Sequence, residues 1–152
     1  MNARGDVMRR ILVIDDEKGI LDVVRSVLSR AGFKVEIALN GRNGIQKFDS
    51  GCFDVVITDI LMPEVDGIDV VKHIRNSCRP YTPIIGCSGT PWLLEAGEFD
   101  TVFLKPFPLA DLARERSVVC GLFVGPVVMR GGKNDDYGRE KRREITFSLR
   151  PS

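Results

Sequence analysis

The sequence has few of the features that mark secreted, membrane or metal-rich proteins. Its 152 residues include a single histidine and four cysteines, and no two cysteines form a C-x-x-C pair. Scattered thiols without a secretory signal are typical of a reduced cytoplasmic protein and not of a disulfide framework. No apolar run approaches the roughly 20 residues that cross a bilayer, so we expect no membrane partner. We expect the lone His73 on the protein surface, not as a metal ligand.

An excess of charge of one sign is also missing. The chain has 22 basic and 21 acidic residues, and a net charge of +1 provides no overall attraction to nucleic acid or to anionic membranes. Residues 130–152 differ, because they have seven basic and four acidic residues and a net charge of +3. The length and the 43% hydrophobic content are ordinary for one globular domain with a proper core.

Short apolar runs alternate along the chain with segments of helical periodicity. We predict strands near 11–14, 34–39, 53–59, 83–88 and 101–105, and helices near 18–31, 42–50, 67–77 and after Pro108. The second strand alternates polar and apolar residues, which places it nearer the sheet edge. Five strands alternating with helices across short loops predict an α/β fold, a three-layer sandwich with a five-stranded parallel sheet and helices on both faces.

Polar side chains follow four of the five predicted strands. Asp15 and Asp16 follow the first strand, Asp59 ends the third, Ser88 the fourth and Lys105 the fifth. Strand ends of a parallel sheet meet at one edge, where ligands and chemistry collect. Oxygen ligands of this kind suit Mg²⁺, and a lysine with a hydroxyl beside them suits a phosphoryl group. Each residue alone has a simpler explanation, such as a helix-capping turn at Asp15–Asp16 or a solvated Lys105, and the coincidence of all five favours a site.

Four motifs carry a resemblance to a known family. They are Val-Ile-Asp-Asp-Glu (13–17), Asp-Val-Val-Ile-Thr-Asp-Ile-Leu-Met-Pro-Glu-Val-Asp-Gly (54–67), Pro-Ile-Ile-Gly-Cys-Ser-Gly (83–89) and Leu-Lys-Pro-Phe (104–107). As a set they resemble the receiver domain of bacterial two-component response regulators, of the chemotaxis-regulator type, over residues 8–117. The resemblance implies a flavodoxin-like sheet with the strand order 2-1-3-4-5.

The resemblance also implies a role for each residue at the strand ends. Asp59 would be the phosphoacceptor, and Mg²⁺ would be bound by Asp16, Asp59 and the backbone carbonyl of Leu61, with Asp15 acting through a bound water. Ser88 would be the switch hydroxyl and Lys105 would hold a phosphoryl oxygen. The bond between Lys105 and Pro106 would be cis, and the absent side chain of Gly89 would leave room for the phosphoryl group.

The implied function is signalling by phosphorylation. The chain would take a phosphoryl group from a sensor histidine kinase or a phosphotransfer protein and would then switch contacts with a downstream protein in a phosphorelay. It would be no enzyme beyond its own phosphorylation and dephosphorylation. Two alternatives stay open, namely a DNA-binding regulator that uses the basic tail and a metal-dependent phosphohydrolase. The tail is too short for a helix-turn-helix domain, and phosphohydrolases of this kind generally have Asp-x-Asp after the first strand, so we do not favour either.

The chain departs from the family pattern in three places. Only 16 residues separate Ser88 from Lys105, which predicts a shortened fourth helix around 91–97. An aromatic switch residue is common three positions before the lysine, but here Val102 stands there, and the neighbouring Phe103 would face the other side of the sheet. The tail 118–152 lies outside the resemblance, and we expect it to form a hairpin or an oligomerisation arm that joins two copies in a homodimer.

Overall fold

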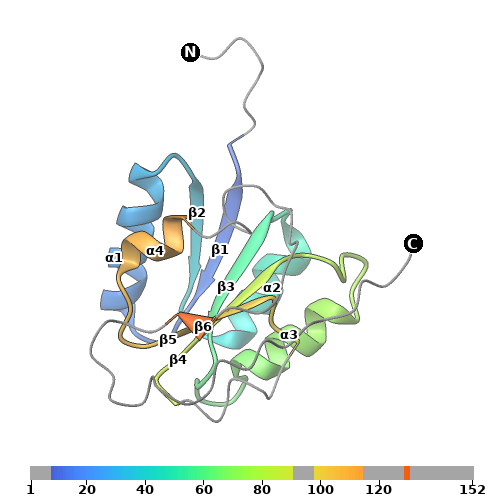
Figure 1. Cartoon of the computed structure of the whole chain (residues 1–152). Helices are drawn as coiled ribbons and strands as arrows, with labels where there is room; N and C mark the ends of the chain where they lie inside the picture. The colour runs from blue at the N-terminus through green and yellow to red at the C-terminus, as the bar shows by residue number, and fades with distance from the viewer. Residues whose placement is uncertain (1–7, 91–97, 115–128, 131–152) are drawn as a thin grey trace.

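In the computed structural model, residues 8–90, 98–114 and 129–130 are described, and they form a parallel sheet with helices on both faces (Figure 1). The strands are β1 (Arg10–Ile14), β2 (Lys34–Ala38), β3 (Val55–Asp59), β4 (Ile84–Ser88), β5 (Thr101–Leu104) and β6 (Met129–Arg130). The helices are α1 (Lys18–Arg30), α2 (Gly41–Ser50), α3 (Gly67–Arg75) and α4 (Leu109–Arg114). In this part of the chain no helix is long and apolar enough to cross a membrane.

The strands lie in the order β2-β1-β3-β4-β5-β6, and every neighbouring pair is parallel. The predicted order 2-1-3-4-5 is therefore confirmed, with β2 at one edge. The two-residue β6 was not predicted, and it pairs with Val102 and Phe103 of β5. The shortened fourth helix falls within 91–97, outside the described residues. So does nearly all of the tail, and the predicted hairpin and homodimer stay predictions.

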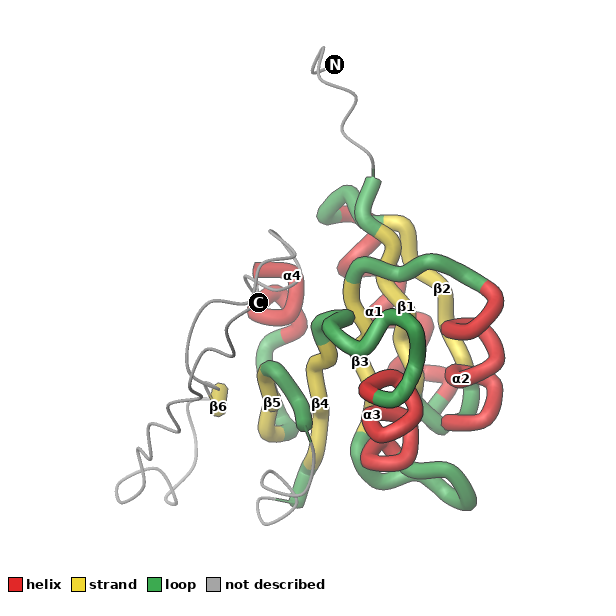
Figure 2. The backbone as a smooth tube through the Cα atoms, turned by 90° about the vertical axis from the view of Figure 1, so that its right-hand side faces the viewer, coloured by secondary structure: helices red, strands yellow, loops and turns green. Residues whose placement is uncertain are grey.

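The two faces of the sheet are covered by different pairs of helices, as the two views of the backbone show (Figure 2). On the first face α2 and α3 pack over alternate strand residues, with Phe48, Val71 and Ile74 buried against Leu12 and Val56. On the second face α1 and α4 pack over the other set of strand residues, with Leu21, Leu28 and Leu112 of the helices buried against Ile57 and Phe103. The period of two along each strand thus divides the apolar residues into two cores.

The predicted switch of face between positions 102 and 103 is confirmed. Val102 is buried on the α2–α3 side, whereas Phe103 is buried on the α1–α4 side. The Phe103 ring lies 4.8 Å from that of Phe107, in the loop that leads to α4. Phe103 is therefore part of the α1–α4 core. Its ring does not lie on the face that an aromatic residue at position 102 would occupy.

Polar side chains fix where two of the helices begin. The Asn40 side chain accepts a hydrogen bond from the Asn43 N–H at 2.8 Å and caps α2. Asp66 and Asp69 form a capping box at the start of α3, in which each side chain accepts from the backbone N–H of the other. Both helices start beside the carboxyl ends of the strands, so these caps help to shape the loops of that edge.

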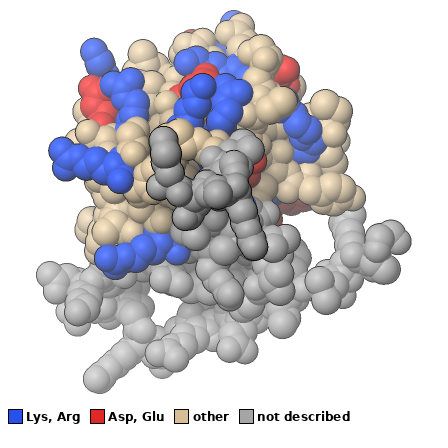
Figure 3. Space-filling view, turned by 90° about the horizontal axis from the view of Figure 1, so that it is seen from above, with Lys and Arg blue, Asp and Glu red and all other residues tan. Residues whose placement is uncertain are grey.

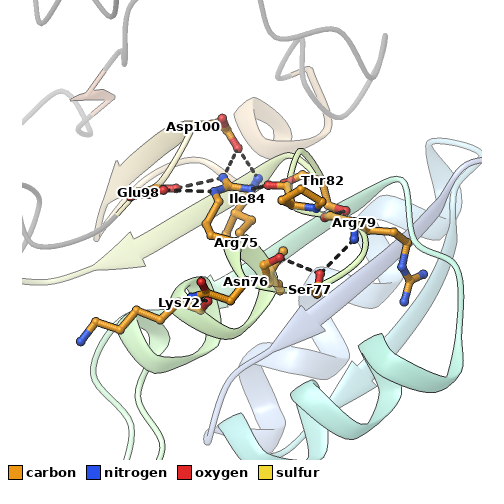
Figure 4. A network of polar contacts seen from close by, with 11 residues as sticks. Lys72, Arg75, Asn76, Ser77, Arg79, Thr82, Ile84, Glu98 and Asp100 are labelled. Carbon is orange, nitrogen blue, oxygen red and sulfur yellow. Dashed lines mark hydrogen bonds and ion pairs between the residues drawn. The ribbon is translucent and has the colours of Figure 1, made fainter. Parts of the chain in front are cut away.

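At the other end of the sheet, where the strands begin, Arg75 at the end of α3 contacts several elements (Figure 4). Its guanidinium donates to the carbonyls of Pro80 and Thr82 at 2.8 Å and to the Asp100 carboxylate at 2.9 Å. The same carboxylate oxygen accepts from the Ile84 N–H at 2.7 Å. One arginine thereby joins α3 to the starts of β4 and β5.

Other cations gather at this edge. Seen from above (Figure 3), its described part shows lysine and arginine side chains with a few carboxylates between them. Arg10 at the start of β1 pairs with Glu36 and stacks over the Phe53 ring. Arg79 donates to the carbonyls of Phe48 and Gly51 at the end of α2. It thereby provides a donor to carbonyls at a helix end, where the helix itself provides none.

Candidate functional site

Three carboxylates meet at the edge where the parallel strands end. Asp15 follows β1, Asp59 is the last residue of β3, and the two strands pair side by side, so both carboxylates reach the same point. With Asp16 they supply oxygen atoms that all lie within 4.8 Å of one another. Asp15 and Asp59 are buried, while Asp16 is exposed. The residues that the sequence picked out as metal ligands are thus brought together.

Lys105 is the cation that faces these carboxylates. It directly follows β5, and its Nζ lies 3.4 Å from Asp59 Oδ2 and 3.5 Å from Asp15 Oδ2. Its backbone N–H donates to the Ser88 carbonyl at 2.8 Å, and the Lys105–Pro106 bond is cis, as predicted. Burial alone would lower the pKa of Lys105, but the carboxylates of Asp59 and Asp15 raise it above its ordinary value. The lysine is therefore a firmly charged ammonium between two buried acids.

The carboxylates hold more negative charge than this single cation balances. Burial raises the pKa of Asp59 from its ordinary 3.8 to about 6, although Lys105 acts in the opposite direction. Burial also raises the pKa of Asp15, and its hydrogen bond from the Glu17 N–H only partly compensates. That hydrogen bond shows that Asp15 forms the expected turn before α1 as well as facing Lys105. Hard oxygen ligands in excess of positive charge are the donor set that Mg²⁺ prefers, so these residues fit the ion.

Ser88 ends β4, between the strands that supply Asp59 and Lys105. Its side chain is buried, and its hydroxyl oxygen accepts from the Thr90 N–H at 3.0 Å. Gly89, the next residue, is exposed, and a Cβ added there would meet nothing within 4 Å. The position therefore borders open space, and the predicted role of Gly89 in admitting a phosphoryl group stays a prediction.

The loop after Asp59 is held close to the strand end by its backbone. Leu61 is 54% exposed, and because its side chain has no ligand atom, only its backbone carbonyl could bind an ion. Gly67 at the start of α3 donates its N–H to the Ile60 carbonyl at 2.9 Å. A Cβ at Gly67 would lie 2.4 Å from the Asp59 carbonyl oxygen, and no side chain fits there. Within the loop Glu64 has a φ of +64°, the left-handed region.

The structure also places two further residues, His73 and Cys87. His73 lies on the surface of α3, where its Nε2 is 2.8 Å from Asp49 Oδ1, away from the carboxylate cluster. Cys87 is buried in the core of the α1–α4 face. Sequence reasoning missed a cavity that begins at Asp59 and Lys105 and extends between α1 and α4. Its walls come from five elements far apart in the chain, so no local motif could have revealed it.

A parallel sheet whose strand ends bring carboxylates to face a lysine is the arrangement of a phosphoryl-binding α/β domain. The family model of the response regulator receiver domain matches residues 11–115, and the chain belongs to this family. The resemblance suggested by the four motifs is thus confirmed.

Individual relatives agree with the assignment. The transcriptional regulatory protein TrcR of Mycobacterium tuberculosis is 33% identical over an alignment of 116 residues, which covers 72% of this chain and 45% of TrcR. The chain therefore spans less than half the length of that relative. The chemotaxis response regulator CheY4 of Vibrio cholerae is 30% identical, with a TM-score of 0.68 over 76% of this chain and 99% of CheY4. TrrA of Thermotoga maritima, solved with Mg²⁺ and BeF, is 31% identical, with a TM-score of 0.66 over 76% of this chain and 100% of TrrA.

Proposed function

We propose that the chain is a phosphorylation-controlled signalling module in which Asp59 accepts the phosphoryl group. The donor is a phosphohistidine on a sensor histidine kinase or a phosphotransfer protein. The observation that carries the proposal is the meeting of Asp59 with Lys105 and two further carboxylates at one sheet edge. With a pKa of about 6, the Asp59 carboxyl is mostly ionised at neutral pH and is available as a nucleophile.

Each residue of the site has a proposed part in the transfer. Asp15, Asp16, Asp59 and the Leu61 carbonyl would hold Mg²⁺, which supplies positive charge for the equatorial oxygens of the phosphoryl group. The Lys105 ammonium holds one phosphoryl oxygen, and it already faces the Asp59 carboxylate. Ser88 leaves its bond with Thr90 and donates its hydroxyl to the new phosphate, which biases the loops toward a second arrangement.

Phosphorylation by acetyl phosphate with Mg²⁺ tests the proposal. We expect one phosphoryl group per chain in the natural protein and none in Asp59→Asn, measured by mass spectrometry of the intact protein. Asp49→Asn changes an exposed aspartate on α2 in the same way and should be labelled like the natural protein. Lys105→Met should slow labelling by about 100-fold, because it removes a preorganised cation. Equal labelling of Asp59→Asn and the natural protein would refute the assignment.

The output is a proposal of its own. We favour contacts with a downstream protein, because the chain belongs to the receiver-domain family and receiver domains act by switching such contacts. DNA binding is the second candidate, since TrcR is named a transcriptional regulatory protein and residues 130–152 are basic. Salt-dependent DNA binding that disappears when 130–152 are deleted would favour this candidate. Turnover of a generic phosphatase substrate would instead favour the phosphohydrolase.

A further inference from the structure

A cavity of about 550 Å³ lies between α1 and α4, and the carboxylate cluster forms part of its lining. The two helices lie side by side on the same face of the sheet in both backbone views (Figures 1 and 2). Asp15, Asp59 and Lys105 are the lining residues that the cavity shares with the candidate site. The volume falls within the range of sites that bind small molecules.

Most of the remaining lining is apolar. Val13, Ile57 and Cys87 come from three neighbouring strands of the sheet. Burial raises the pKa of the Cys87 thiol to about 12, so the thiol is neutral and behaves as a small apolar group. The helices add Val23 from α1, which is 50% exposed, and Leu109 from α4. An apolar molecule of suitable size would be removed from water in this space, which favours its binding.

The charged residues of the lining have an excess of negative charge. They are the acids Asp15, Glu17 and Asp59 and the single cation Lys105, so the carboxylates outnumber the ammonium by two when all four are ionised. Asp16 lies outside the lining, but its carboxylate is within 4.8 Å of those of Asp15 and Asp59. An anionic or neutral ligand would leave this excess uncompensated, whereas a cationic ligand would balance part of it.

We propose that the cavity binds a small organic amine, with its ammonium group among the carboxylates and its apolar part between α1 and α4. Charge complementarity sets this orientation. The ammonium is attracted to Asp15, Asp59 and Glu17, and the apolar part contacts residues such as Val23 and Leu109. Such a ligand meets both halves of the lining with one molecule.

Binding of the amine should compete with binding of Mg²⁺. This competition rests on the proposed function, which assigns Asp15, Asp16 and Asp59 to the ion. An ammonium beside these carboxylates and a divalent cation on them repel each other, so each lowers the affinity of the chain for the other. A bound amine would therefore oppose phosphorylation of Asp59 and make the receiver respond to the concentration of an apolar amine.

Three probes that differ in the charge of one group test the inference on the full chain. Phenylbutylamine, phenylbutanol and phenylbutyrate share a phenyl ring and a short alkyl chain, and their polar ends are cationic, neutral and anionic. Titration calorimetry in metal-free buffer at about pH 8 keeps the amine protonated and the acids ionised. We expect the amine to bind at least about tenfold more tightly than the alcohol, and the carboxylate to bind most weakly.

A charge variant tests the polar end of the cavity. Glu17→Gln removes one of the acids without changing its size, and it should weaken binding of the amine by about twofold to fivefold and leave binding of the alcohol unchanged. Asp22→Asn is the matched control, because it removes the same charge from an exposed residue of α1 outside the lining. The control should bind all three probes as the natural protein does.

Two wall variants test the apolar end. Val23→Asn and Leu109→Asn place an amide on the α1 side and on the α4 side, and each should weaken the amine and the alcohol alike by about threefold or more. Ser26→Asn places the same amide at an exposed position of α1 outside the lining and should have no effect. Binding of Mg²⁺ by a variant, measured in the same way, shows that its fold and its carboxylate cluster are intact.

Addition of Mg²⁺ completes the test, because it should weaken the amine by about tenfold or more and the alcohol much less. Equal affinities of the amine and the alcohol, tighter binding of the carboxylate or no binding of the amine would overturn the inference. Amine binding that both wall variants or Mg²⁺ leave unchanged would overturn it as well. None of these results bears on the phosphoacceptor, which the labelling of Asp59→Asn tests, so the two proposals fail separately.

Discussion

The two edges of the sheet use the same kinds of residue for opposite purposes. Where the strands begin, Oδ2 of the Asp100 carboxylate accepts hydrogen bonds from the Arg75 guanidinium and from the Ile84 N–H. Where the strands end, Asp15 and Asp59 share one ammonium, that of Lys105, at 3.4–3.5 Å. Burial raises the pKa of both Asp59 and Asp100, but only Asp100 has a guanidinium within hydrogen-bond distance.

The comparison teaches that a buried carboxylate is available for reaction when few hydrogen-bond donors surround it. A carboxylate that accepts short hydrogen bonds from two donors, as Asp100 does, connects the elements that carry those donors. A carboxylate with one distant cation keeps lone pairs for a metal ion and for phosphorus. Three predictions test this contrast, and they are ordered from the largest expected effect.

Arg75→Met should cost the most stability. The substitution keeps the apolar stem but leaves the Asp100 carboxylate and three carbonyls, those of Pro80, Thr82 and Glu98, without their donor. We expect the free energy of unfolding to fall by about 2–4 kcal/mol, as for other broken buried pairs, measured by urea denaturation. Lys72→Met removes an exposed cation from the same helix and should change stability by less than about 0.5 kcal/mol. Similar values for the two variants would show that the starting edge is not held by Arg75.

Asp59→Asn should change how stability depends on pH. The folded protein binds this proton more tightly than the unfolded chain does, because the pKa of Asp59 is about 6 instead of 3.8. The natural protein should therefore lose stability as the pH rises from 4 to 7, whereas the amide of the variant does not titrate in this range. In metal-free buffer the variant should gain about 2 kcal/mol over the natural protein across this interval, measured by urea denaturation at each pH. Parallel curves for the two proteins would mean that Asp59 is not destabilised by its burial.

Gly41→Ala should show that the reactive edge depends on close backbone contacts. A Cβ at Gly41, the first residue of α2, would lie 2.2 Å from the Val65 carbonyl oxygen in the loop after Asp59. We expect a loss of about 1–2 kcal/mol in the free energy of unfolding and slower labelling by acetyl phosphate, because the loop has to move. Gly19→Ala is the matched control, since a Cβ there meets nothing within 4 Å, and alanine should stabilise α1 by up to about 1 kcal/mol. Equal stabilities of the two variants would contradict the contact.

Much of this fold could be predicted because its signals are local. The apolar run 55–57 and the helical spacing of Leu21, Val24 and Leu28 report which residues are buried, and burial drives the formation of both elements. The roles given to the strand-end residues came from the resemblance that the four motifs carry. The prediction that these residues lie together came from the alternation of strands and helices, which indicates a parallel sheet. The pairing of Arg75 with Asp100 carried no such signal, because the two residues are 25 positions apart and each is of a type that is ordinary on a protein surface.

The sequence by itself determined the alternation of strands and helices, the order of the polar residues at the strand ends and therefore the family of the protein. The tertiary structure alone decided how far apart these groups stand and how much water reaches them. The separation between Lys105 and Asp59, the raised pKa of Asp59 and the apolar cavity beside it all follow from packing among elements far apart in the chain. The physical reason is that periodicity reports which face of an element is buried, whereas charge and burial at a point depend on every element that meets there.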